Sequence, residues 1–309
     1  MKYDMICVGM ALIDSIIKGF DENPVSASGF RAGSCTLNIG GEAVNEAITA
    51  ARLDMKCAIM CSLADDSAGH MIRDCLNKNG VDTSLILNRK EPPTPVTTMF
   101  VNDDGTRKSV TTMAHAYNFG PDKHISLLTD TKAILLGSLF RAPFDDPDII
   151  KHVVSAASKA GVIIFADTKL PNFKKLSLDD IKDSLSYIDY ITPNEDEARY
   201  YSAKTKPEDM ADVFLGYGVK NVIIKLGSKG CYFKNADMSF YLDAFDIDAV
   251  DATGAGDSFV AGLASQIING LDITKAVEFA NACGAICTTA VGATTAIKDC
   301  DQIREFLER

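Results

Sequence analysis

The sequence lacks the marks of several protein classes. Its nine cysteines form no CxxC pair and are odd in number, so neither a disulfide framework nor a zinc site is predicted. Basic residues are few, 31 against 42 acidic ones for a net charge of −11. This balance argues against a nucleic acid as a partner, because the overall field repels phosphates. No apolar run approaches the roughly eighteen residues that span a bilayer. The N-terminus also has no signal-peptide pattern. We therefore expect a soluble, cytoplasmic protein with reduced, buried cysteines.

Two common nucleotide-binding motifs are missing as well. The chain has no GxxxxGK[ST] motif, and FLGYGVKN is only a near miss to GxGxxG. These absences argue against a P-loop NTPase and against a dinucleotide-dependent dehydrogenase. There is also no internal repeat and no low-complexity linker.

Apolar runs of strand length alternate with helical patterns. The runs lie at 5–9, 57–63, 133–139, 162–166 and 221–226. The helical patterns are EAVNEAITAARL from Glu42, DDPDIIKHVVSAASKAG, and DSFVAGLASQIING from Asp257. This alternation predicts an α/β fold with parallel strands joined by crossover helices. A length of 309 residues leaves one or two domains open.

Two segments break the alternation. Residues 94–114 form two β-rich runs around the turn NDDG, which is a hairpin signal. Residues 16–40 are irregular, rich in Gly and Ser, and end in the strand-like SCTLNI. Together they are interpreted as a small β-sheet that covers the main sheet. Surface excursions without a role are the alternative.

The stretch VDATGAGDSF, residues 250–259, contains no basic residue but indicates an anion site. Phe259, Val260 and Leu263 share one helical face, which places TGAG at the N-terminus of a buried helix. The first N–H groups of a helix have no internal partner and, with small residues around them, can hold a charged oxygen. For Asp257 two interpretations remain open, an N-cap and a proton acceptor beside the anion.

Three further motifs accompany this one. They are GGEAVNEA from Gly40, NEDE from Asn194, and KLGSKG from Lys225. In this order, and with DATGAGDSF as the most specific, the motifs resemble those of the PfkB carbohydrate kinases, the ribokinase-like family, across essentially the whole chain. GGEAVNEA and VGATTAIK are most similar to a branch of bacterial sugar kinases of uncertain substrate.

The resemblance implies a ribokinase-like three-layer α/β/α sandwich with a mainly parallel sheet of nine or so strands. A single domain, residues 1–309, would carry a β-sheet lid formed by inserts at about 16–40 and 94–118. The implied activity is magnesium-dependent transfer of the ATP γ-phosphoryl group to a hydroxyl of a monosaccharide or sugar acid. The implied assembly is a homodimer formed through the lid.

The resemblance also implies residue roles. Asp257 would be the base, and the N–H groups of Gly254, Ala255 and Gly256 would hold the phosphoryl oxygens. Four residues would face the sugar: Asp14, Gly40, Gly41 and Asn45. Six would face the nucleotide: Asn194, Lys225, Gly227, Ser228, Gly230 and Asn281.

Glu197 would reach Mg²⁺ through water, and Asp251 with the Thr253 carbonyl, completed by carbonyls near residues 290–292, would form a site for K⁺. Each assignment has a structural alternative: loop capping for Asp14, an acidic helix start for Asn194 and Glu197, and a hairpin glycine for Gly230. Lys225 can equally extend from a strand end into solvent.

The substrate that accepts the phosphoryl group is the least defined part of this prediction. Ribokinases usually have GGKGAN where this chain has GGEAVN, so ribose does not carry over. Arg107, Arg141 and Lys169 are cationic candidates for an acidic sugar or a sugar phosphate, although each is equally explained as a solubilising residue. A nucleoside kinase, with Phe100 or Tyr117 stacking on the base, is one alternative, and a non-catalytic sugar- or nucleotide-binding regulator is another.

Overall fold

The centre of the protein is one large, mainly parallel sheet. The structure is a computed structural model that describes residues 1–20, 29, 31–102, 106–112 and 119–308. In the described part, six neighbouring strands run parallel and two at one edge pair antiparallel. In sheet order the strands are β14 (Ser239–Leu242), β13 (Cys231–Asn235), β12 (Asn221–Lys225), β11 (Tyr190–Ile191), β10 (Ile163–Thr168), β9 (Thr131–Leu139), β1 (Tyr3–Val8) and β4 (Cys57–Met60).

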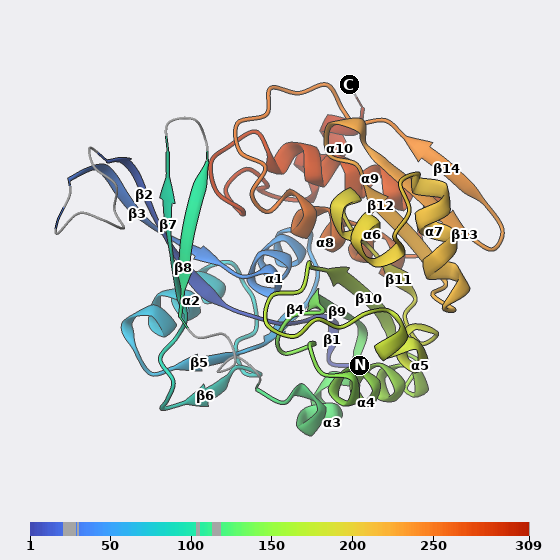
Figure 1. The fold of residues 1–309 in the computed structure, drawn as a ribbon, viewed down its shortest axis with the longest axis horizontal. Helices are drawn as coiled ribbons and strands as arrows, with labels where there is room; N and C mark the ends of the chain where they lie inside the picture. The colour runs from blue at the N-terminus through green and yellow to red at the C-terminus, as the bar shows by residue number, and fades with distance from the viewer. Residues whose placement is uncertain (21–28, 30, 103–105, 113–118, 309) are drawn as a thin grey trace.

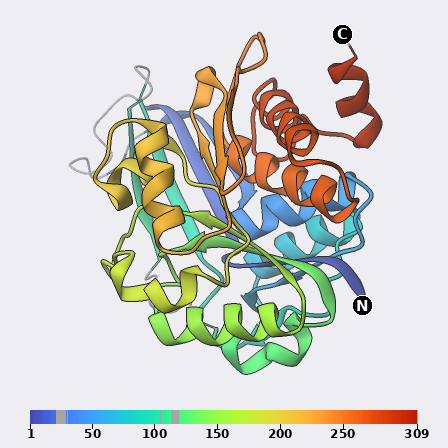
Figure 2. The same ribbon diagram turned by 90° about the vertical axis from the view of Figure 1, so that its right-hand side faces the viewer.

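Helices cover both faces of this sheet, which gives three layers (Figure 1, Figure 2). One face packs against α3 (Ile125–Leu128), α4 (Pro147–Lys159), α5 (Lys182–Leu185), α6 (Glu195–Ser202) and α7 (Pro207–Gly216). The other lies under α1 (Glu42–Arg52), α2 (Ser67–Lys78), α8 (Ala255–Ile268) and α9 (Ile273–Cys287), and α10 (Cys300–Leu307) packs on the outer side of α9. In β1, Ile6 and Val8 enter one core while Met5 and Cys7 enter the other. This two-sided burial explains why the strands are apolar runs in the sequence.

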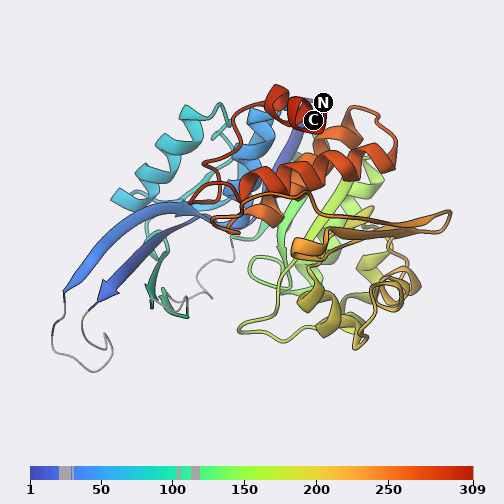
Figure 3. The same cartoon turned by 90° about the horizontal axis from the view of Figure 1, so that it is seen from above.

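A second sheet projects away from the main body (Figure 1, Figure 3). Its order is β3 (Ala32–Gly40), β2 (Leu12–Phe20), β7 (Val96–Val101) and β8 (Arg107–Thr111). The pair β7 and β8 is antiparallel, as the hairpin signal predicts. The described parts of residues 16–40 are more regular than expected, because β2 and β3 pair from Leu12 with Gly40 out to Phe20 with Ala32. We call this sheet the lid.

The remaining elements are short. A two-stranded sheet joins β5 (Ser62–Ala64) to β6 (Leu87–Arg89). Single 3₁₀ turns lie at η2 (Pro121–His124), η3 (Asp179–Ile181) and η4 (Gly227–Lys229). All nine cysteines are free, and seven are buried; Cys35 on the lid is exposed, so the prediction of buried cysteines is wrong there. In the part of the chain that the structure describes, no helix combines the length and apolarity needed to cross a membrane.

The order of elements confirms the α/β prediction, and one detail of it is wrong. The large sheet has eight strands in the described residues, which agrees with the nine or so that are expected. The last glycine-rich helix begins at Ala255, two residues before the start predicted from its apolar face.

Candidate active site

A pocket of about 1520 Å³ lies between the large sheet and the lid. The segments that follow β1, β9, β10, β11 and β12 all contribute to its wall, so it opens at the carboxyl ends of the parallel strands, where ligands of open α/β sheets bind. Its lining contains most of the residues predicted for the site: Asp14, Gly41, Asn45, Asn194, Lys225, Gly227, Ser228, Gly230, Asp251, Thr253, Gly254, Ala255, Gly256, Asp257 and Asn281.

The N-terminus of α8 faces this pocket. Gly254 is the N-cap residue, with φ of 80°, and a Cβ there would lie 2.5 Å from Ala293, so glycine is required. Among the described residues, the N–H groups of Gly254 and Gly256 have no acceptor, whereas that of Ala255 donates to the Ala252 carbonyl. Two of the three N–H groups predicted to hold an anion are therefore free to bind one, and that of Ala255 is already engaged.

Asp257 occupies the third position of α8 and is not its N-cap. The capping interpretation of Asp257 is thus wrong, because the chain enters the helix through Gly254 in a left-handed conformation. The Asp257 carboxylate accepts a hydrogen bond from Asn45 Nδ2 at 2.7 Å, and the residue is only 6% exposed. Burial raises the pKa of Asp257 to about 6, with Lys169 and the Asn45 hydrogen bond opposing the rise and Glu42 and Asp167 adding to it. A carboxylate with this pKa is ionised at neutral pH and is a stronger base than an exposed aspartate.

One end of the pocket is built by β2 and the start of α1. Gly41 is the N-cap of α1, with φ of 103°, and a Cβ there would collide with the Met10 carbonyl. Asp14 lies within β2, paired with Asn38 and Thr97, so its loop-capping alternative is wrong. Gly40 does not line the pocket. It lies against the Asp14 carboxylate, where a larger residue would displace it.

The opposite end is formed by the β12–β13 hairpin and α9. Gly227 and Ser228 form the η4 turn, and Gly230 packs against the main chain of Leu242, which agrees with its interpretation as a hairpin glycine even though it also lines the pocket. The side chain of Asn281 donates to the Asp243 carbonyl at 2.8 Å. Lys225 does not extend into solvent, because its ammonium group pairs with a buried carboxylate.

Asn194 and Glu197 form a capping box at the start of α6. The Asn194 side chain accepts from the Glu197 N–H at 2.9 Å, and the Glu197 carboxylate accepts from the Asn194 N–H at 3.0 Å. Glu197 also accepts from Thr168 Oγ1 and is buried, so it is not a surface residue. Burial and then the charge of Asp167 raise its pKa, while Lys225 and Lys169 oppose the rise. The helix-start interpretation is thus correct, and Asn194 still faces the pocket.

Asp251 organises the loop that precedes α8. Its Oδ1 accepts from the Thr253 N–H and hydroxyl, at 3.0 and 2.7 Å, and its Oδ2 accepts from the Gly292 N–H at 2.9 Å. Burial alone would raise the pKa of Asp251, but these hydrogen bonds outweigh it and lower the pKa. Across the described ranges, no group of three or more His, Cys, Asp or Glu side chains is arranged to hold a metal ion.

Some candidates lie away from the pocket or outside the description. Arg107 begins β8, and its side chain is not among those described. Phe100 contacts Phe20 edge to face and does not line the pocket; Thr97, three residues earlier in β7, does line it, and the alternation of a strand places Phe100 on the other lid face. The proposed stacking of Phe100 on a base is therefore wrong. Tyr117 lies outside the described residues.

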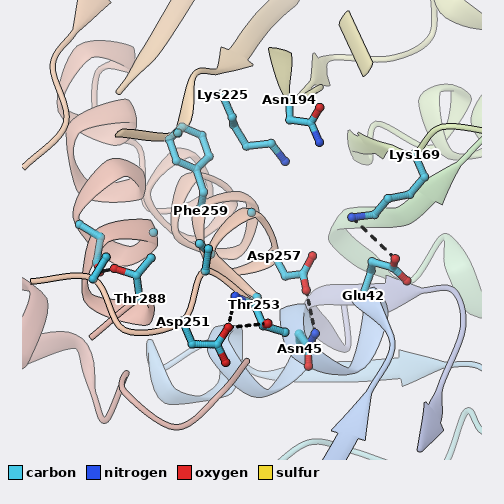
Figure 4. Close-up of a pocket in the computed structure, with 18 of the residues that line it drawn as sticks. Glu42, Asn45, Lys169, Asn194, Lys225, Asp251, Thr253, Asp257, Phe259 and Thr288 are labelled. Carbon is cyan, nitrogen blue, oxygen red and sulfur yellow. Dashed lines mark hydrogen bonds and ion pairs between the residues drawn. The ribbon is translucent and has the colours of Figure 1, made fainter. Parts of the chain in front are cut away.

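Two acidic residues that the sequence analysis did not single out pair with the lysines that line the pocket. Asp167, at the end of β10, is 1% exposed and accepts from Lys225 Nζ at 2.6 Å. Glu42, in the first turn of α1, lies 3.7 Å from Lys169 Nζ (Figure 4). An acidic residue at the carboxyl end of a buried strand was the available signal for Asp167.

Free backbone N–H groups next to a buried carboxylate, in a pocket bordered by the lid, suit a phosphotransferase that acts on a small hydroxyl compound. Comparison with known proteins specifies the class further. The chain belongs to the pfkB family of carbohydrate kinases, whose family model matches residues 3–300. It is 29% identical over 282 residues to a probable fructokinase-2 of Arabidopsis thaliana, with 85% of each chain covered. It is also 26% identical to an ATP-dependent 6-phosphofructokinase of Thermoanaerobacterium thermosaccharolyticum, covering 99% of this chain and 94% of the relative.

Solved structures agree with the fold. The ribokinase of Arabidopsis thaliana, complexed with ribose and ATP, superposes with a TM-score of 0.88 at 22% identity over 100% of both chains. A ribokinase II candidate from E. coli, in complex with ATP and Mg²⁺, gives a TM-score of 0.82 at 24% identity over 99% of both chains. These likenesses confirm the ribokinase-like sandwich and its small separate sheet.

Proposed function

We propose that this carbohydrate kinase transfers the γ-phosphoryl group of ATP to a hydroxyl of a monosaccharide or sugar acid, with Asp257 as the base. The observation that carries the proposal is the position of the Asp257 carboxylate, which is buried in the pocket and oriented by Asn45 beside the free N–H groups of α8 (Figure 4). The acceptor oxygen bonds to phosphorus, the bond from phosphorus to ADP breaks, and the hydroxyl proton passes to Asp257. The backbone at Gly254–Gly256 stabilises the phosphoryl oxygens.

The nucleotide is assigned to the end of the pocket lined by the β12–β13 hairpin and α9. We place its phosphates near Lys225, Gly227 and Ser228, and the rest of the nucleotide near Gly230 and Asn281. The two structural relatives that hold ATP support an ATP donor.

Mg²⁺ would lie near Asn194, with Glu197 acting through water. The residues present fit this hard cation by their chemistry, because Asn194 lines the pocket with an amide group and the buried Glu197 carboxylate lies next to it, bonded to the Asn194 N–H. The ion would neutralise the triphosphate. A monovalent cation such as K⁺ is assigned to Asp251 and the Thr253 carbonyl, whose oxygen donors suit it.

The sugar is assigned to the opposite end, against Asp14, Gly41 and Asn45, with Gly40 holding Asp14 in place. Carboxylate and amide groups can accept from and donate to adjacent hydroxyls, as a polyol requires. The hairpin's Arg107 is kept as a contact to an acidic substituent.

The lid and the assembly are proposed together. Residues 1–309 form one kinase domain, with the lid as its cover. Two copies pair through the lid, where Leu37 and Val110 are 55% and 68% exposed. The free cysteines agree with a reducing, cytoplasmic location.

An ADP-release assay over pentoses, hexoses, sugar acids and nucleosides tests the function. We expect ADP release that depends on a sugar. Release that depends only on nucleosides would favour the nucleoside kinase, and saturable thermal shifts without any ADP would favour a non-catalytic regulator.

A further inference from the structure

One buried carboxylate behind the pocket lining pairs with two of the lysines that line the pocket. Asp167 Oδ1 accepts from Lys225 Nζ at 2.6 Å and from Thr192 Oγ1 at 2.8 Å. Its Oδ2 lies 3.7 Å from Lys169 Nζ. Two ammonium groups therefore share this one carboxylate, and Glu42 supplies a second carboxylate to Lys169.

The two ammonium groups approach the backbone anion site from different directions. A Cβ built on Gly256 would lie 3.2 Å from Lys225 Nζ, so that nitrogen sits directly over the start of α8. Lys169 Nζ lies instead 3.7 Å from Glu42 Oε1 on α1. In Figure 4 both lysine side chains extend toward the space between Asn194 and Asp257. Lys225 thus borders that space on the nucleotide side and Lys169 borders it on the sugar side.

Lys169 has a fixed main chain and a loosely held ammonium group. Its N–H donates to the Leu139 carbonyl at 3.0 Å, and its carbonyl accepts from Tyr201 Oη at 2.7 Å. Both carboxylates near its Nζ lie at 3.7 Å, beyond the usual length of a charged hydrogen bond. The ammonium group is therefore attracted electrostatically while its N–H donors, within the described part of the chain, remain available to a ligand.

The same surroundings keep Lys169 charged. Burial by itself lowers the pKa of this lysine, but Glu42, Asp167 and Asp257 together outweigh burial and raise it. With its side chain 23% exposed, the group is partly shielded from water, which strengthens its interaction with any anion that enters.

We propose that Lys169 is a catalytic residue that donates to the oxygens of the phosphoryl group as this group passes from ADP to the sugar, with Asp167 and Glu42 as its positioning residues. The inference rests on the proposed kinase function. In the transfer, the acceptor oxygen bonds to phosphorus, the bond to ADP breaks and Asp257 takes the hydroxyl proton. Lys169 supplies charge and no proton. Glu42 holds the ammonium group toward the sugar side until the phosphoryl group arrives.

A comparison of Lys169→Met with Lys169→Arg tests this role. Lys169→Met is expected to lower kcat by about 100-fold or more, as the loss of one transition-state donor does, while KM for ATP and for the sugar changes little. Lys169→Arg keeps the charge and should recover part of kcat. Lys220→Met is the matched control, because Lys220 also pairs with a partly buried aspartate, Asp189, at 2.6 Å, and does not line the pocket. It should leave kcat unchanged.

Binding of ADP with aluminium fluoride and the sugar gives a second measurement that does not depend on turnover. This mixture mimics the phosphoryl group in transfer. Lys169→Met should lose affinity for it by a factor similar to the loss in kcat and keep its affinity for ADP alone. If Lys169→Met does not fold, the double variant Lys169→Met with Glu42→Gln takes its place. The second substitution removes the charge of the Glu42 carboxylate, which loses its ion pair with Lys169.

Two results would overturn the inference. One is an unchanged kcat in Lys169→Met, and the other is a loss confined to KM for an anionic sugar, which would make Lys169 a substrate-binding residue instead. Wild-type protein is assayed first with the same acceptors. Failure of the wild type to turn over any acceptor refutes the kinase proposal itself, whereas normal turnover by both wild type and Lys169→Met refutes only the role of Lys169.

Discussion

Replacement of Asp257 by Asn should inactivate the protein and stabilise it at the same time. In the folded protein the pKa of Asp257 is raised from 3.8 to about 6. The folded state therefore holds its proton more tightly than the unfolded state, and stability falls as the pH rises from about 4 to about 6. Above pH 6 the ionised carboxylate costs about 3 kcal/mol, at 1.36 kcal/mol per pKa unit. Asn removes this charge and can still accept from Asn45.

Thermal denaturation of wild type and Asp257→Asn at two pH values checks this reasoning. At about pH 7.5 the variant should melt higher by on the order of 5 °C, and near pH 5 the difference in unfolding free energy should drop to roughly half. Activity should fall by about 100- to 10,000-fold, as it does when a general base is lost. Asp237→Asn, in an exposed turn, is the control and should change neither the melting temperature nor the activity. A variant that is less stable than wild type at both pH values would refute the account of this carboxylate.

Three further predictions concern its neighbours. Asn45→Ala removes the hydrogen bond that lowers the pKa of Asp257. The midpoint of the acid limb of the kcat/KM profile should therefore rise above its wild-type value near pH 6. Gly254→Ala forces a Cβ against Ala293 at a positive φ and should cost about 1–3 kcal/mol of stability along with most activity; unchanged melting would contradict the strain. Asp251→Ala removes the hydrogen bonds that hold Thr253, so the variant should no longer turn over faster in K⁺ than in Na⁺ or tetramethylammonium. Equal rates of the wild type in the three salts would refute the proposed cation site.

The sequence predicts the fold well because the evidence for it is local. Each parallel strand, such as β1 or β9, is a continuous apolar run, since helices bury both of its faces. The predicted start of α8 lies two residues too late. Gly254 caps the helix in a left-handed conformation, and the pattern of apolar residues does not reveal such a cap. The regular pairing of β2 with β3 was missed because the exposed lid strands lack a buried apolar face.

The site was predicted only where motifs mark it. Asn45 and Asp257 are 212 residues apart and meet through a hydrogen bond, and both were found by their motifs. Asp167 and Glu42 were missed because their importance arises from Lys225 and Lys169, which reach them across strands and helices. Such charge pairs depend on tertiary packing, so no spacing along the chain predicts them.

The most direct test of the central claim is ³¹P NMR of wild-type protein incubated with ATP, Mg²⁺ and the acceptor that best promotes ADP release. The proposed transfer at the start of α8 predicts one new phosphomonoester signal that grows in step with ADP and is absent with Asp257→Asn. Inorganic phosphate growing in step with ADP, with no ester signal, would contradict the claim.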